Sequence, residues 1–494
     1  MRTRLSCCML MACALFTSPV EAQGWRVLVD ARAQATSYRG WRVDSIAAAD
    51  TVTGSTGGPE TPDGYVANCD GGPICRFWRP GAESRGVPAV TTIDATAWGL
   101  GLTGLSLHTR GRVGVDLGRD KPWYGPDRTL ELVEGYADLE RKRYQLRAGR
   151  QLVTGRLGWW GIDGGRGWIR SPTRGLEASV YGGWGLARSA NLTATSDALN
   201  PLGDFQTARR QWAIGATGQW STTRGSLQAQ YHRETSGADG GVTIERGALS
   251  AEGLLSRTVG LSGGATYDLT SGLWGSWDLG GRATLGRWHA TARMRQYRPL
   301  FDLWSVWQVF SPVAYHAVDG SIAVRLHPAI ALRATGERYW FDPTETSTPL
   351  VSVVNTGWRM SVGATWSATP TLTLDGEIRR EFGVGAYANS AQGTLTWTPR
   401  PRWLLRANAG HLERPLEYRY DVATLNWLGA GADWRADDRL TLGLGVDRWD
   451  ETRARPDAAA FAWDQLRLSA RITWLLVSDA DHLPLPPGRP RRGR

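Results

Sequence analysis

Hydrophobic and polar residues alternate along most of the chain, in runs of about ten residues. In 288–295 every even position is apolar and every odd position is polar, and 466–474 repeats the same pattern. Similar runs occupy 105–116, 330–335 and 372–379. A period of two places alternate side chains on opposite faces of an extended backbone, so these runs predict β-strands with one apolar and one polar face.

The connections between these runs are alternately short and long. Short turns fall at 286–287 and 437–439, for example, whereas 187–208 and 298–313 are long and more polar. The segments 268–272 and 383–384 are short where the alternation predicts a long connection. Strands joined in this way form an up-and-down meander. We expect about 22 strands, within a range of 20 to 24, with the division of 24–38 and 163–186 left open.

The length of the runs favours a transmembrane barrel over a soluble sheet. Strands in soluble sandwiches are usually five or six residues long, whereas a tilted strand needs about nine to eleven to cross a bilayer. Barrels in membranes combine an apolar outer face, a polar lumen, short periplasmic turns, long outer loops and an even number of strands. A soluble propeller would show a recurring blade-length motif, which this chain lacks. The sequence therefore predicts one all-β antiparallel barrel over 23–478, with the lipid bilayer as partner.

Composition sharpens this interpretation. The chain has 494 residues, of which 26 are Trp and 61 are Gly, and 41% are hydrophobic. Trp prefers the interface between membrane and water. We expect many of the Trp residues near predicted strand ends to form girdles around the barrel, and these are Trp25, Trp98, Trp184, Trp212, Trp220, Trp288, Trp397, Trp403, Trp434, Trp449 and Trp474.

The ends of the chain carry their own signals. Residues 1–22 combine a basic start, an apolar run and the Val20-Glu21-Ala22 site, which predicts a secretory signal peptide cut after Ala22 and export to the outer membrane of a Gram-negative cell. Cleavage before Cys13, as in a lipoprotein, is the alternative. Residues 479–494 are rich in Pro and Arg and predict a periplasmic tail that could bind an acidic partner protein.

The longest connection, 40–88, contains the two Cys residues that lie beyond the signal peptide. In an exported protein, Cys69 and Cys75 are most simply a disulfide that closes a small loop. The connection either caps the outer surface or folds into the pore, and the width of a 22-strand barrel favours partial constriction of the pore.

One stretch has a family likeness. Tyr144-Gln-Leu-Arg-Ala-Gly-Arg-Gln151, followed by Gly158-Trp-Trp-Gly-Ile-Asp-Gly-Gly165, resembles a segment of the outer-membrane porins of the alginate-export and related families. The likeness covers about 25 residues and implies a diffusion or export channel of the outer membrane.

Enzymatic chemistry finds little support in the chain. The seven His residues are scattered and none forms a pair at metal-ligand spacing, and no haem-attachment motif occurs. Gly-x-Gly matches are uninformative in a chain with 61 Gly. We therefore expect no enzyme activity, no cofactor, no metal and no nucleic-acid partner.

The polar face of the strands is the candidate functional surface, because it would line the pore. By alternation, the side chains that we expect there are Arg112, Arg147, Arg293, Arg295, Arg333, Glu337, Asp375, Glu377, Arg406, Arg467 and Arg471. The simpler interpretation is a wetted wall in which Arg and carboxylate groups brace each other. The sharper one is a positive field that favours small anionic solutes.

Three functions suit such a barrel. A porin-like channel for passive passage of small hydrophilic solutes is the main hypothesis. The alternatives are a sheath or scaffold around a periplasmic or electron-transfer partner, and a surface adhesin that uses the long loops. Conductance in a planar bilayer separates the first from the other two.

Overall fold

The computed structural model describes residues 24–54, 57–118, 130–186, 211–237, 240–298, 313–342, 355–383, 386–414, 423–453 and 463–478. The expected signal peptide, its cleavage site and the tail 479–494 lie outside these ranges. Within them, no helix has the length and hydrophobicity that a membrane span requires. The only helical turn among the described residues is η1 (Ala48–Asp50).

Within the described ranges, all of the strands have ten or more residues except three, which have two each. Their bounds are β1 (Gly24–Ala47), β2 (Val52–Thr53), β3 (Pro59–Glu60), β4 (Ala67–Asn68), β5 (Ile74–Gly86), β6 (Pro88–Trp98), β7 (Leu105–Asp116), β8 (Leu130–Glu140), β9 (Tyr144–Gly155), β10 (Gly158–Ser171), β11 (Leu176–Leu186), β12 (Gln211–Ser221), β13 (Gly225–Ser236), β14 (Val242–Leu254), β15 (Val259–Asp268), β16 (Leu273–Leu285), β17 (Trp288–Tyr297), β18 (Tyr315–His327), β19 (Ile330–Phe341), β20 (Thr356–Thr369), β21 (Leu372–Gly383), β22 (Ala386–Arg400), β23 (Trp403–Arg414), β24 (Ala423–Arg435), β25 (Leu440–Arg453) and β26 (Trp463–Val477).

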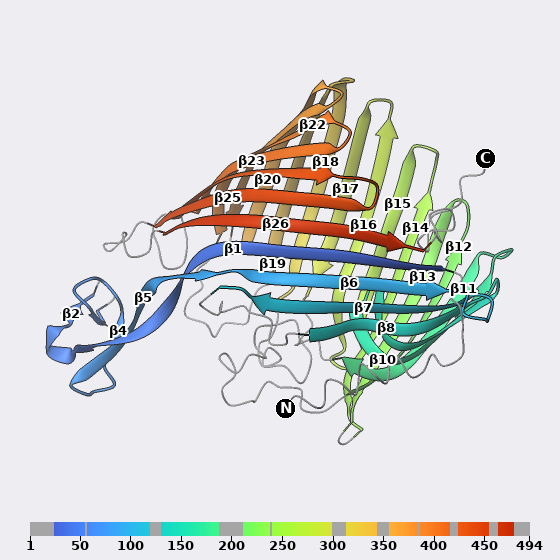
Figure 1. The fold of residues 1–494 in the computed structure, drawn as a ribbon, viewed down its shortest axis with the longest axis horizontal. Helices are drawn as coiled ribbons and strands as arrows, with labels where there is room; N and C mark the ends of the chain where they lie inside the picture. Colours follow the sequence, from blue (N-terminus) through green and yellow to red (C-terminus); the bar gives the residue numbers. More distant parts are fainter. Residues whose placement is uncertain are drawn as a thin grey trace.

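These strands close into a single antiparallel barrel of 22 strands, as the alternation of the sequence predicts. From β6 onward each strand pairs with the next one in the chain, and β1 closes the ring by pairing with both β6 and β26 (Figure 1). At the closure, the Asp30 carboxylate accepts hydrogen bonds from Arg471 and Thr473, both at 2.9 Å. Closure pairs the first strand of the ring with the last, so neither is left as a terminal edge strand, as a barrel in lipid requires.

Short turns connect the strands at the end of the barrel where the chain enters and leaves the wall. In the turn between β24 and β25, the backbone N–H groups of Arg439 and Leu440 donate to the Asp437 carboxylate at 2.7 and 2.8 Å. These bonds hold the pKa of Asp437 below its usual value, first through Arg439 and then through Leu440. At the opposite end, the structure adds a short connection at 156–157, between β9 and β10, that the sequence pattern does not resolve.

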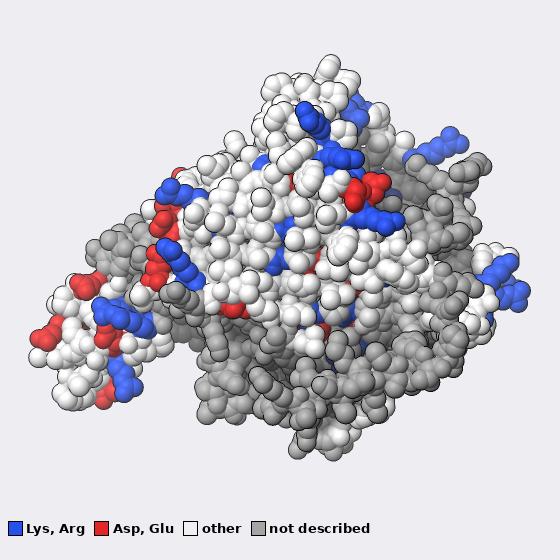
Figure 2. All heavy atoms as spheres, in the orientation of Figure 1, with Lys and Arg blue, Asp and Glu red and all other residues white. Residues whose placement is uncertain are grey.

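Apolar side chains cover the outside of the barrel. Ile378 of β21 and Leu444 of β25 are 68% and 70% exposed. In a transmembrane barrel, lipid covers such outward apolar side chains. Figure 2 shows that charged side chains are sparse on the wall that faces the viewer. Many of the predicted girdle Trp residues, such as Trp288 and Trp474, are exposed at the short-turn end.

One Trp of the predicted girdle faces the other way. Trp449 stacks on Trp427 with ring centroids 5.7 Å apart, and the Arg467 guanidinium lies 5.1 Å from the centroid of Trp449. Its register partner is Gln465, on the inward face. Trp449 is therefore a lumen residue, because its odd position on β25 places it opposite to the outward Leu444 and Val446.

The segment 40–88 differs from the expected constriction. Strands β1 and β5 pair from Thr36–Gly86 to Ala47–Ile74 and continue the wall as a hairpin that projects past the barrel (Figure 1). The expectation of a constricting loop is wrong for these described residues, because a continuous ladder directs the hairpin along the strand axis instead of across the pore. At its tip, β4 pairs with β5, and Tyr65 and Phe77 stack at 5.9 Å in a small core.

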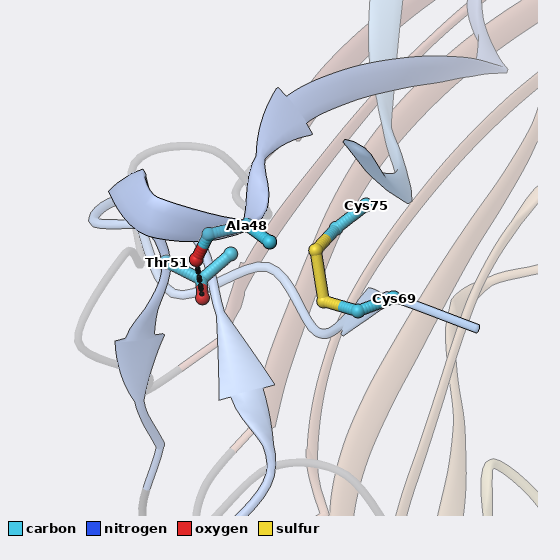
Figure 3. The surroundings of a disulfide bond; sticks show 4 residues. All are labelled: Ala48, Thr51, Cys69 and Cys75. Carbon is cyan, nitrogen blue, oxygen red and sulfur yellow. Dashed lines mark hydrogen bonds between the residues drawn. A yellow bond between two sulfur atoms is a disulfide. The ribbon is translucent and has the colours of Figure 1, made fainter. Parts of the chain in front are cut away.

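The expected disulfide between Cys69 and Cys75 is present in this tip (Figure 3). Cys75 is fully buried, and beside it the Thr51 hydroxyl donates to the Ala48 carbonyl at 2.8 Å. Lower on the hairpin, the pKa of Asp44 lies below its usual value, first because the Ser45 N–H donates to it and then because of the guanidinium of Arg79.

Replacing both cysteines with Ser is expected to loosen the tip but not the barrel. Without the disulfide the unfolded segment gains conformational entropy, which lowers the stability of the tip by about 2 kcal/mol for a loop this short. The tip should therefore become sensitive to protease in the variant, while the wall stays resistant. Limited proteolysis followed by mass spectrometry measures both. Cleavage at equal rates in the variant and in the unchanged protein would contradict a stabilising role.

Candidate functional site: the charged inner wall

A chain of ion pairs crosses five neighbouring strands, β17 to β21, on the inner wall. It runs through Arg293, Asp319, Arg295, Glu337, Arg359 and Glu381. Arg295 contacts Asp319 at 3.6 Å and also pairs with Glu337. Arg359 then links Glu337 at 2.9 Å to Glu381 at 2.7 Å. Each inner cation of the chain thus has two carboxylate neighbours, one on either side.

Two tyrosines complete this chain from neighbouring strands. The Tyr315 hydroxyl donates to Glu337, and the Tyr339 hydroxyl donates to Glu381 at 3.3 Å. The Arg359 guanidinium lies 4.6 Å from the centroid of the Tyr339 ring. A planar guanidinium that is both paired and stacked loses little further freedom in a fixed position, so the wall here is preorganised.

A second cluster lies on the same strands. Arg333 of β19 binds Asp375 of β21 through two hydrogen bonds of 2.6 and 2.8 Å, the bidentate arrangement that guanidinium and carboxylate favour. Arg333 also approaches Glu377 at 3.4 Å, and Glu377 accepts from Arg379 at 3.1 Å. Four charged side chains from two strands therefore balance one another.

The other predicted pore-lining residues have partners of their own. Arg112 pairs with Glu131, Arg147 with Asp138 at 3.3 Å, Arg406 with Asp433 at 3.4 Å, and Arg471 with Asp30 at 2.7 Å. Arg467 is the exception, because its contacts among the described residues are the Gln465 side-chain oxygen and the Trp449 ring, both neutral. Most of the Arg residues that the sequence assigns to the lumen are thus compensated by a neighbouring carboxylate.

Several members of the ion-pair chain escape the sequence analysis. Asp319 and Arg359 of the chain, and Asp138 beside Arg147, occupy the same alternating face as the predicted residues but were not singled out, whereas the alternation does place Glu381 on that face. The alternation in 315–327 and 356–369 could have identified the first two. Their pairing could not have been found in the sequence, because it depends on the register between strands.

An aromatic cluster also faces inward, on β10 to β13. His232 is fully buried and stacks on Trp160 with centroids 4.1 Å apart. Its ring nitrogens contact the Tyr181 hydroxyl at 2.8 Å and the Glu234 carboxylate at 2.9 Å. A ring with both nitrogens bonded has a fixed orientation, so His232 is a structural centre of this part of the wall.

The inner wall also borders a polar hollow of about 700 Å³ near the short turns. Gln219, Glu252, Ser262, Arg282 and Asp319 are among the side chains that line it. No group of His, Cys, Asp and Glu that could hold a metal ion occurs in the part of the chain that the structure describes.

Comparison with known proteins gives likenesses of architecture. No family model matches the chain, and no curated protein matches it. The solved structures it resembles are outer-membrane β-barrel proteins. They include the siderophore receptor PirA from Pseudomonas aeruginosa, at 11% identity and a TM-score of 0.48, covering 91% of this chain and 80% of that one. OccAB4 from Acinetobacter baumannii has 6% identity and a TM-score of 0.40, covering 93% and 100%.

A third likeness is to OccD3 (OpdP) from Pseudomonas aeruginosa, at 9% identity and a TM-score of 0.38, covering 92% of each chain. At these scores the likenesses do not carry a function, which has to rest on the residues of this chain. The resemblance of 144–165 to alginate-export porins likewise stays an expectation.

Proposed function

We propose that this protein is an outer-membrane channel through which small hydrophilic solutes diffuse. The observation that carries the proposal is the two-faced wall, with apolar side chains outside and connected ion pairs inside. A soluble barrel would not expose to water a continuous apolar face over many neighbouring strands, of which Ile378 and Leu444, at 68% and 70%, are examples. A barrel filled by its own core would not line its interior with Arg–carboxylate chains.

We also propose that the pore prefers anions weakly. The ion pairs cancel most of the formal positive charge of the lumen, so the field that remains is local instead of general. It is strongest where an Arg lacks a carboxylate partner among the described residues. Arg467, beside Gln465 and Trp449, is one such position.

The purified protein is expected to conduct ions by itself. Planar bilayers that receive the refolded barrel should show stepwise currents in KCl, without a partner protein. Outer-membrane fractionation and a heat-dependent shift in gel mobility check location and folding independently. A folded, membrane-located barrel that carries no current would refute the channel and favour a sheath or an adhesin.

A further inference from the structure

Two guanidinium groups face each other on the inner wall at β9 and β10. Arg147 and Arg166 are direct register partners. Arg147 donates to Asp138 at 3.3 Å. Among the described residues, Arg166 donates only to the Ser179 hydroxyl, at 3.4 Å, and forms no ion pair. Like charges directly opposite each other on adjacent strands repel. An anion placed between these two groups would relieve that repulsion.

Aromatic rings hold both groups in fixed planes. The Arg147 guanidinium lies 4.1 Å from the centroid of Tyr136 and 5.3 Å from that of Trp168. The Arg166 guanidinium lies 4.3 Å from the centroid of Trp168. The buried Nε of Arg166 donates to no group among the described residues. Stacked guanidinium groups leave their N–H edges available, and a carboxylate fits such edges.

Beside this pair, two neighbouring strands of the barrel wall are hydrogen-bonded over only part of their length. Strands β8 and β9 pair only over Gly135–Glu140 and Gln145–Arg150, whereas β9 pairs with β10 along its whole length from Tyr144 to Gly155. On the N-terminal side of Gly135, residues 130–134 of β8 are hydrogen-bonded to β7 but not to β9. We call this stretch, 130–134 against 151–155, the β8–β9 seam.

A glycine marks the base of the seam. Gly149 has a φ of +129°, and a Cβ at this position would lie 2.3 Å from the Gly135 carbonyl oxygen. Only glycine permits both this backbone conformation and this approach. The two strands therefore meet closely at Gly149 and Gly135 and lose their pairing beyond that point.

Side chains replace the missing ladder. Arg150 donates to the Leu132 carbonyl at 2.9 Å and is itself held by Asp163 at 2.7 and 2.9 Å. The Arg150 side chain thus joins the two strands where the ladder is missing, so the seam can open without breaking a continuous ladder.

An apolar groove lies on the outward face at the base of the seam. Its volume is about 500 Å³, within the range of small-ligand sites. Its lining includes Val27, Ala95, Leu107, Ala137 and Ala148, on strands that lie side by side in Figure 1. Along β9, the four residues from Arg147 to the seam span about 13 Å. An alkyl chain can therefore reach from the Arg pair to the groove.

We propose that the β8–β9 seam is a lateral portal for an anionic single-chain amphiphile. Its carboxylate binds between Arg147 and Arg166, and its alkyl chain passes between the strands into the outward groove. The proposal rests on the channel function, because it requires a water-filled lumen on one side of the wall and lipid on the other. It adds a second exit, for solutes that partition into the membrane.

The binding half is tested with cis-parinarate, a fluorescent fatty acid, and its methyl ester. The unchanged barrel in detergent should prefer the acid. Arg166→Gln should weaken acid binding roughly tenfold and remove the preference, whereas Arg325→Gln, on β18 and distant from the seam, should leave both unchanged. Equal acid binding by the Arg166→Gln and unchanged proteins would overturn the proposed site. Heat-dependent gel mobility confirms that each variant is folded.

The portal half is tested by locking the seam. The lock is the double variant Leu132→Cys and Leu152→Cys, cross-linked across the seam from the outside by a bismaleimide. The control is Leu249→Cys and Ala265→Cys, cross-linked in the same way between register partners of the complete ladder of β14 and β15. The lock should slow delivery of parinarate from the lumen into quencher-containing vesicles roughly tenfold, and the control should not. KCl current should persist in both. Equal delivery rates would overturn the portal, while absence of KCl current in the unchanged protein would instead refute the channel.

Discussion

Replacing both Arg293 and Arg295 with Glu is expected to make the pore cation-selective. The change places two carboxylates beside Asp319 and Glu337, which the two arginines now neutralise. Four carboxylates would then share one region of the wall. We expect the ratio of K⁺ to Cl⁻ permeability to rise roughly fivefold or more at low salt, because a negatively charged wall concentrates cations and repels anions.

The measurement is the reversal potential across a planar bilayer under a KCl gradient. The shift should be large at 0.1 M salt and small at 1 M, since the screening length falls from about 10 Å to about 3 Å. The matched control exchanges the pair, with Arg293→Asp and Asp319→Arg, and preserves the summed charge. If the exchanged pair shifts the potential as much as the double Glu variant, local packing and not charge is responsible.

The second large effect concerns the stability of the barrel. Arg246 of β14 and Asp268 of β15 form an ion pair at 2.9 Å, with side chains only 8% and 7% exposed. Asp268→Asn retains an acceptor for the Ser271 N–H but removes the carboxylate charge that faces Arg246. Breaking a buried ion pair in this way costs about 3 kcal/mol.

A fall in the temperature at which the folded gel band disappears would report this loss. The control is the double variant with Arg246→Met and Asp268→Leu, which removes both charges and should be more stable than Asp268→Asn alone. Equal transition temperatures for the single variant and the unchanged protein would show that water or another group compensates Arg246.

The alternation of apolar and polar residues was sufficient to predict the barrel, because side-chain direction in a strand repeats every two residues. It was least informative where glycines dilute the pattern, as around Gly155 and Gly158, where the short connection at 156–157 is missing from the prediction. The hairpin of β1 and β5 was missed for another reason. Pro80 and Gly81 interrupt the pattern in 74–86, and pairing with 36–47 joins segments far apart in the chain.

For the inner wall, too, the sequence predicts one part of the arrangement and not the other. The sequence identifies that Arg293, Arg333 and Glu377 share a face, but not which carboxylate neutralises which guanidinium. That depends on register, which sets Arg295 opposite Ala317 while its ion pairs reach diagonally to Asp319 and Glu337. The formal charge of the chain therefore overstates the field of the lumen, and the opposition of Arg147 and Arg166 becomes visible only in the structure.

The hydrogen bonds at the closure of the ring also constrain how the molecule is made. Asp30 and Arg471 are 441 positions apart, and neither β1 nor β26 can complete its pairing until nearly the whole chain has been delivered. Contacts of such sequence separation form slowly, because a long loop must close before they are gained. The β26-facing edge of the first strand therefore stays unpaired until the last strand is in place.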